Sequence, residues 1–165
     1  MPTMSLQNRV DRALQSCKFP CVYKLGRGGF NAAKPLDPAW DSGRSDCSGF
    51  VSHVIQTRRS PKELRPFWIE TTMVYNDATG KRLAFRAIPG PIPGCIVVYG
   101  DSGGKQGHMG IVVEVSPDGS YDTVECASGI MGSILKKKAI RRRNDAQKLF
   151  GPRRAIFCVL RGDKP

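Results

Sequence analysis

The hydrophobic periodicity of this chain changes once, near residues 93–94, and that change constrains the fold more than any other feature. Before it, apolar residues recur at helical spacing, over residues 5–17 and again over residues 50–55. After it, short runs of apolar and β-branched residues are bounded by glycines and turn sequences, as strands are. The predicted strands are residues 95–99, 109–115, 121–126 and 155–160.

Two further helices are predicted in the first half. Ser60 followed by Pro61 and, three residues after the cap, Glu63 is typical of a helix start, and a second short helix is expected over residues 69–76. Residues 20–45 are rich in Gly, Pro and Asp and predict an irregular loop. Helices followed by a meander of strands indicate an α+β domain over residues 1–165, with helices packed on one side of an antiparallel sheet of about five or six strands.

Composition limits the classes of function. The chain has 165 residues and a net charge of +12, which implies attraction to a polyanion such as cell wall, nucleic acid or anionic membrane. No apolar run approaches the roughly 20 residues of a membrane span. The first 19 residues hold no apolar signal-peptide segment, so the expected location is the cytoplasm, or export by a route without a cleaved leader.

Six cysteines are present, without a C-x-x-C pair, and there are only two histidines, so no metal site or other cofactor is expected. Cys17 and Cys21 are four residues apart and are predicted to share a helix face. Two reduced thiols are favoured there over a disulfide.

Cys47 is the first candidate for chemistry, because it lies where the loop ends and a helix begins. The N-terminal end of a helix stabilises a thiolate, which is the nucleophilic form of cysteine. The same N–H groups can form part of an oxyanion hole. The alternative is a buried helix cysteine with a packing role.

His108 is the second candidate. It begins an apolar strand after a loop, residues 102–107, that is expected to be flexible. A cysteine nucleophile needs an imidazole that forms an ion pair with it and later protonates the leaving amine. The alternative is a histidine that ends a strand for packing reasons. His53, six residues after Cys47, does not share its helix face and is expected to be structural or exposed.

Together these segments resemble the NlpC family of bacterial, papain-like cysteine peptidases. The resemblance is close at D-C-S-G-F-V, residues 46–51, and at G-H-M-G-I-V-V, residues 107–113. Tyr23 and Gly26 are similar to an upstream Tyr-x-x-Gly of the family, and Pro93-Gly94 precedes a similar strand. Cys95 stands where the family usually has an aspartate.

The resemblance implies a Cys-His-acid triad with Cys47 as nucleophile and His108 as general base. The family places the third polar residue on the next strand, which contains Glu125 and Cys126. Glu125 is preferred because a carboxylate accepts a hydrogen bond strongly and a thiol does not.

The resemblance also implies residues that bind the substrate. Tyr23 would direct its hydroxyl toward the oxyanion, and Asp46 and Ser48 would lie where the family binds the amine end of the substrate. Trp68, chosen as an aromatic residue in the helical region, is either a wall of the cleft or a core tryptophan.

The resulting hypothesis is a cysteine peptidase or amidase that hydrolyses peptidoglycan stem peptides. The resemblance implies the bond between D-glutamate and the diamino acid as the candidate bond. The substrate partner would be peptidoglycan or a muropeptide, without specific nucleic acid. Candidate roles are a phage enzyme, an effector toxin with a delivery or immunity protein, and wall-peptide recycling. The alternatives are an acyltransferase using the same Cys-His pair and a non-catalytic polyanion-binding module.

Basic runs at residues 136–138, 141–143 and 153–154 indicate either a solvent-exposed face or a surface that binds anionic wall polymer. Nucleic-acid binding is disfavoured, because no known binding motif or aromatic stacking pattern accompanies these runs.

Overall fold

The computed structural model describes residues 4–39, 43–60, 68–81, 83–128 and 137–163. Its helices are α1 (Leu6–Ser16), α2 (Cys47–Val54), α3 (Thr71–Asn76) and α5 (Gln147–Phe150). A π-helical turn, Asp77–Lys81, continues α3, and a 3-10 turn, Gly151–Arg153, continues α5. No helix in these ranges is long and apolar enough to cross a membrane.

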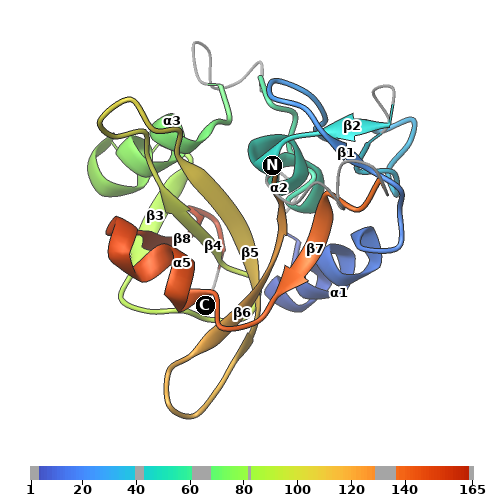
Figure 1. The fold of residues 1–165 in the computed structure, drawn as a ribbon. Coiled ribbons are helices and arrows are strands. Elements are labelled where there is room, and N and C mark those ends of the chain that lie inside the picture. The colour runs from blue at the N-terminus through green and yellow to red at the C-terminus, as the bar shows by residue number, and fades with distance from the viewer. Residues whose placement is uncertain (1–3, 40–42, 61–67, 82, 129–136, 164–165) are drawn as a thin grey trace.

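Six strands form one antiparallel sheet in the order β3-β8-β4-β5-β6-β7 (Figure 1). They are β3 (Phe85–Ile88), β4 (Ile96–Tyr99), β5 (His108–Val115), β6 (Tyr121–Cys126), β7 (Ile140–Arg143) and β8 (Ile156–Leu160). A separate parallel pair, β1 (Val22–Tyr23) and β2 (Arg44–Ser45), lies within the loop region before α2.

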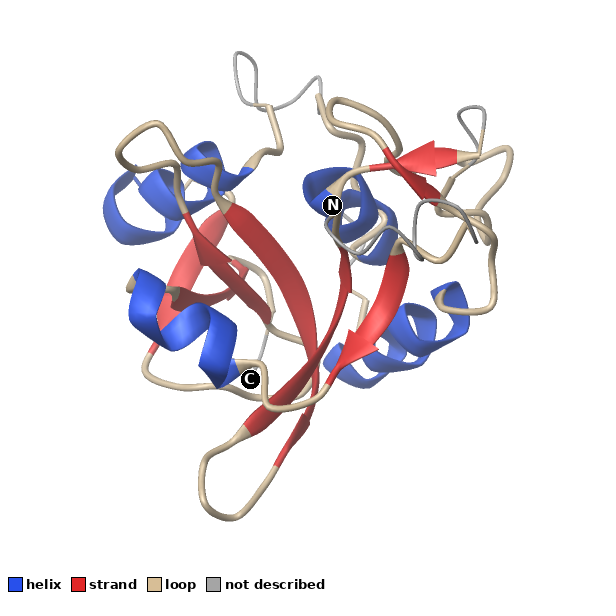
Figure 2. Ribbon diagram, in the orientation of Figure 1, coloured by secondary structure: helices blue, strands red, loops and turns tan. Residues whose placement is uncertain are grey.

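Helices cover both faces of the sheet (Figure 2). On one face, residues of α1 and α2 form a buried cluster with Ile96 and Val98 of β4. On the other face, Val97 of the same strand packs with Phe150 of α5. Successive residues of a strand point to opposite faces, and the central strands are apolar at both sets of positions, so each face needs a cover.

Most of the predicted elements are confirmed. α1 begins after Ser5, whose hydroxyl accepts a hydrogen bond from Asn8 N at 3.2 Å. α3 begins after Glu70, whose carboxylate accepts from the N–H groups of Thr72 and Met73. The four predicted strands are found to within one residue. The helix expected from Ser60 lies outside the described residues.

Three expectations differ from the structure. β3 and β7 were not predicted, because one is short and the other is largely arginine. A helix, α5, covers the sheet face that was expected to be free. The prediction that Cys17 and Cys21 share a helix face is wrong, because α1 ends at Ser16 and Cys21 pairs in extended conformation with Lys138. The six cysteines are all unpaired thiols.

Candidate active site

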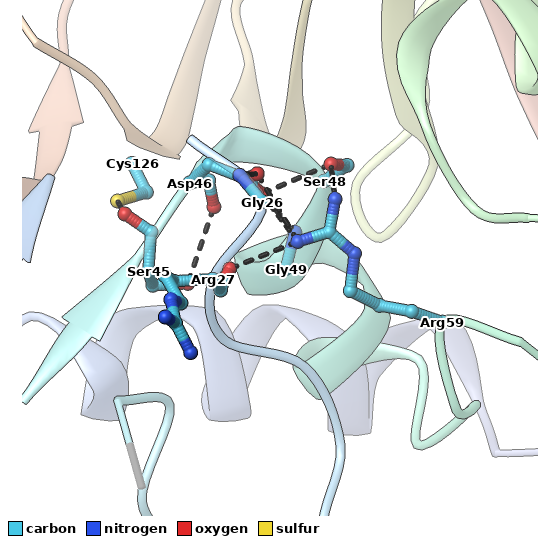
Figure 3. Close-up of polar contacts among 8 residues, drawn as sticks. All are labelled: Gly26, Arg27, Ser45, Asp46, Ser48, Gly49, Arg59 and Cys126. Atoms are coloured by element: carbon cyan, nitrogen blue, oxygen red, sulfur yellow. Dashed lines mark hydrogen bonds and ion pairs between the residues drawn. The ribbon is translucent and has the colours of Figure 1, made fainter. Parts of the chain in front are cut away.

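The carboxylate of Asp46 caps α2 and fixes its first turn (Figure 3). Oδ1 accepts hydrogen bonds from the N–H of Gly49 at 2.6 Å and the hydroxyl of Ser48 at 2.9 Å. Oδ2 accepts from the N–H of Gly26 at 2.6 Å, which ties the preceding loop to the helix. These bonds satisfy groups that a helix start leaves unpaired, so Cys47, the first residue of α2, has a defined position.

Arg59 adds a cation to this network (Figure 3). Its Nη1 lies 3.1 Å from each oxygen of Asp46, and its Nη2 donates to Ser48 Oγ at 2.7 Å. The side chains of Asp46 and Arg59 are 1% and 8% exposed, so the pair is shielded from water. The carboxylate expected to meet a substrate amine is therefore already neutralised within the protein.

The N-terminus of α2 also requires close backbone approach. The carbonyl of Arg27 accepts hydrogen bonds from Asp46 N at 3.1 Å and from Arg59 Nη1 at 2.9 Å. A Cβ atom on Gly49 would collide with that carbonyl oxygen. Glycine after the D-C-S sequence therefore has a packing reason here: it admits the loop that holds the capping aspartate.

His108 joins Cys47 to Glu125. Nε2 of His108 lies 2.8 Å from Oε2 of Glu125, and the ring also has a side-chain hydrogen bond with Cys47. Since Nε2 engages the carboxylate, Nδ1 is the nitrogen left for the thiol. Phe150 stacks on the imidazole, with ring centroids 5.7 Å apart and an interplanar angle of 21°, which restricts the orientation of the ring.

The imidazole strongly favours its charged form. Burial disfavours the imidazolium, but the hydrogen bonds and negative charges of Cys47 and Glu125 outweigh burial and raise the pKa of His108 to about 9. A protonated His108 next to Cys47 stabilises a thiolate. The arrangement can therefore supply both a nucleophile and an acid for a leaving group.

Glu125 remains ionised although it is fully buried. Burial acts to raise its pKa, but the hydrogen bonds and charges of His108 and Arg143 lower it below the usual value. Nε of Arg143 donates to Oε1 of Glu125 at 2.7 Å, and Nε of Arg141 lies 3.9 Å from the same oxygen. Cys126, the alternative third residue, points to the opposite face and donates to the carbonyl of Ser45 at 3.4 Å.

A cleft of about 280 Å³ opens beside Cys47. All four predicted substrate-binding residues, Tyr23, Asp46, Ser48 and Trp68, line it. Trp68 is 45% exposed, so the core alternative is wrong, and its ring centroid lies 5.2 Å from the guanidinium of Arg59. Burial, and then the neighbouring charges of Cys47 and Asp46, raise the pKa of Tyr23, which keeps its hydroxyl protonated.

Asp101, which precedes the loop of residues 102–107, is hydrogen-bonded to α3 and to the last residue of that loop. Oδ1 of Asp101 accepts from Gly107 N at 2.6 Å and from Thr71 Oγ1 at 3.2 Å. The N–H of Asp101 donates to Thr72 Oγ1 at 3.0 Å. These bonds fix the chain where it enters β5, and with it the position of His108.

His53 is remote from this chemistry. It is 1% exposed, and its Nδ1 lies 3.4 Å from Nη2 of Arg12. Burial, with a smaller effect from Arg12, lowers the pKa of His53 to about 3, so it is neutral. The structural interpretation is confirmed and the exposed one is wrong.

Three residues of the site were missed by sequence reasoning: Arg59, Asp101 and Arg143. Nothing in the local sequence connects Arg59 to Asp46. Arg143 could have been found, because strand alternation in residues 141–143 places two of the three arginines on one face. Within the described residues, no group of three or more His, Cys, Asp or Glu side chains is arranged to hold a metal ion.

Comparison with known families agrees with this geometry. Residues 38–127 match the CHAP domain, and the match includes Cys47, His108 and Glu125. CHAP is a cysteine- and histidine-dependent amidohydrolase or peptidase domain, related to the NlpC and papain-like enzymes that the sequence resembles. No curated protein matches the chain. Because the match spans more than half of its residues, this chain belongs to the CHAP domain family.

Proposed function

We propose that the protein is a cysteine peptidase or amidase that hydrolyses peptidoglycan stem peptides through Cys47, His108 and Glu125. The observation that carries the proposal is the contact of His108 with both Glu125 and Cys47, and Cys47 lines the cleft. The raised pKa of His108, about 9, favours a thiolate–imidazolium pair at neutral pH.

In the proposed reaction, the thiolate of Cys47 attacks the carbonyl carbon of an amide and forms a C–S bond. His108 gives its proton to the leaving nitrogen as the C–N bond breaks. The acyl-enzyme has no thiolate, so the imidazole no longer has that partner and can accept a proton from the attacking water. The C–S bond then breaks, which releases the acid and restores the ion pair.

The oxyanion that forms during attack would be held by N–H groups at the start of α2 and by the hydroxyl of Tyr23. Tyr23 can donate because its raised pKa keeps it protonated. Trp68 and the neighbouring Arg59 would form a wall for the acyl part of the substrate. We assign Asp46 and Ser48 to the same wall, with Asp46 acting chiefly through the helix start that it caps.

The net charge of +12 would hold the protein to anionic wall polymer. More specifically, the proposed bond is the one between D-glutamate and the diamino acid, as in NlpC-type enzymes. A phage enzyme or a delivered effector, with a delivery or immunity protein as partner, would place this activity at the cell wall.

Digestion of purified peptidoglycan and soluble muropeptides tests the proposal. The wild-type protein should release new fragments, and the mass of each fragment should identify the bond that is cut. The Cys47→Ala variant should release none, because Cys47 is the thiol that contacts His108. Absence of new fragments with wild-type protein whose Cys47 is shown to be reduced would contradict a wall substrate.

The rate should also depend on pH. His108 must be protonated to donate to the leaving nitrogen, and its pKa of about 9 lies above the ordinary 6.5. The value of kcat/KM should therefore stay high through neutral pH and fall as the pH rises through about 9, by about tenfold per unit. A profile of kcat/KM from pH 6 to 10 on one soluble muropeptide measures this. A fall centred near 6.5 would contradict the ion pair.

A further inference from the structure

A second cavity, of about 480 Å³, lies beside the cleft and is strongly cationic. Lys105, Arg153 and Arg154 line it, and its lining contains no carboxylate. Among the described residues, no ion pair joins any of these three cations to an acid. The volume is within the usual range for a small-ligand site. The cavity therefore presents uncompensated positive charge.

Local structure positions the backbone of Lys105 and the guanidinium of Arg153. Lys105 closes a tight turn with Ser102, in which each backbone N–H donates to the other residue's carbonyl at 3.0 Å. The turn requires glycines, since Gly103 and Gly104 have φ values of +56° and +74°. The guanidinium of Arg153 lies 6.0 Å from the ring centroid of Tyr99, a cation–π contact.

The cavity adjoins the active site on the side of His108. Tyr99, which lines the cavity, is paired directly with His108 across β4 and β5, and their ring centroids are 6.3 Å apart. Gln106 lines both the cavity and the cleft that contains Cys47. A substrate that extends along the cleft past Gln106 can therefore reach the cavity.

The position relative to His108 decides which part of a substrate arrives there. The histidine protonates the leaving nitrogen, so the leaving amine must lie on its side of Cys47, and the acyl part lies toward Tyr23 and Trp68. Guanidinium groups pair with carboxylates through parallel hydrogen bonds. We propose that the cavity binds a carboxylate carried by the leaving-amine part of the substrate. This inference rests on the proposed function and adds to it how the enzyme recognises the leaving-amine part of its substrate.

A pair of synthetic stem peptides tests it: L-alanyl-γ-D-glutamyl-diamino acid with a free C-terminal carboxylate, and the same peptide as its C-terminal carboxamide. Wild-type protein should have a lower KM for the acid than for the carboxamide. The Arg153→Ala/Arg154→Ala variant should raise KM for the acid about tenfold or more, with little change in kcat and little change for the carboxamide. Equal effects on both peptides would overturn the proposal.

A charge-matched control is Lys18→Ala/Lys34→Ala, which removes two exposed cations that do not line the cavity. This control should leave the preference for the acid unchanged. If it loses the preference as the arginine variant does, net charge explains the effect and the proposal is overturned.

If wild-type protein cleaves neither peptide, calorimetric titration of the Cys47→Ala protein with each peptide distinguishes failure of the proposed cleavage from failure of the cavity assignment. Tighter binding of the acid, abolished by the two arginine substitutions, supports the cavity assignment even where the proposed cleavage fails. If both peptides bind with equal affinity, or if neither binds, the cavity assignment is overturned.

Discussion

The His108→Ala variant should lose at least about 10³-fold in peptide hydrolysis, because one substitution removes both the ion-pair partner of Cys47 and the proton donor for the leaving amine. The loss should appear in kcat rather than KM, since the imidazole contacts Cys47 and Glu125 and does not form the wall of the cleft. Initial rates on a soluble muropeptide, with the melting temperature of each variant, measure it.

Thiol alkylation provides a second readout that needs no substrate. At pH 6 the imidazolium is present in the wild-type protein, because its pKa is about 9, so iodoacetamide should modify Cys47 faster than the other five cysteines. In His108→Ala this advantage should disappear, while the half-buried Cys17 reacts as before and acts as an internal control. Residue-resolved mass spectrometry follows both thiols. An unchanged rate at Cys47 would show that His108 does not activate it.

The Asp46→Ala variant should show the largest loss of stability, about 3–5 kcal/mol in the free energy of unfolding. The substitution leaves Arg59 buried without its carboxylate and removes the acceptors for Gly26, Ser48 and Gly49. Breaking a buried ion pair from one side has a cost of this size. For a domain of this length the melting temperature should fall by about 10 °C. Thermal unfolding followed by circular dichroism measures the shift.

Two variants control for this result. Glu114→Ala removes an acid that pairs with Arg142 at the surface, where Glu114 is 63% exposed, and should cost less than about 1 kcal/mol. Asp46→Asn keeps one side-chain oxygen as an acceptor and loses the charge. Its loss of stability should therefore lie between those of Asp46→Ala and Glu114→Ala. If Asp46→Ala unfolds at the same temperature as Glu114→Ala, the buried network does not stabilise the helix start.

Much of the fold could be predicted because its signals are local. The apolar spacing within residues 5–17 and the change from loop to helix at Cys47 depend on neighbours a few residues away. The central strands were recognised from their apolar runs. β7 was missed because Ile140–Arg143 is mostly basic. Its arginines pair with acids on the strands β5 and β6, which the local sequence does not reveal.

The sequence by itself determined that a cysteine begins a helix and a histidine begins a strand, since caps and periodicity are properties of adjacent residues. It also favoured Glu125 over Cys126 on chemical grounds, and the tertiary structure places Glu125 next to His108. Only the tertiary structure decided that Arg59 neutralises Asp46, that Arg143 supports Glu125, and that Lys105 shares a cavity with Arg153 and Arg154. These contacts join segments between 13 and 49 residues apart in the chain. They depend on strand order and loop packing, which local propensities do not specify.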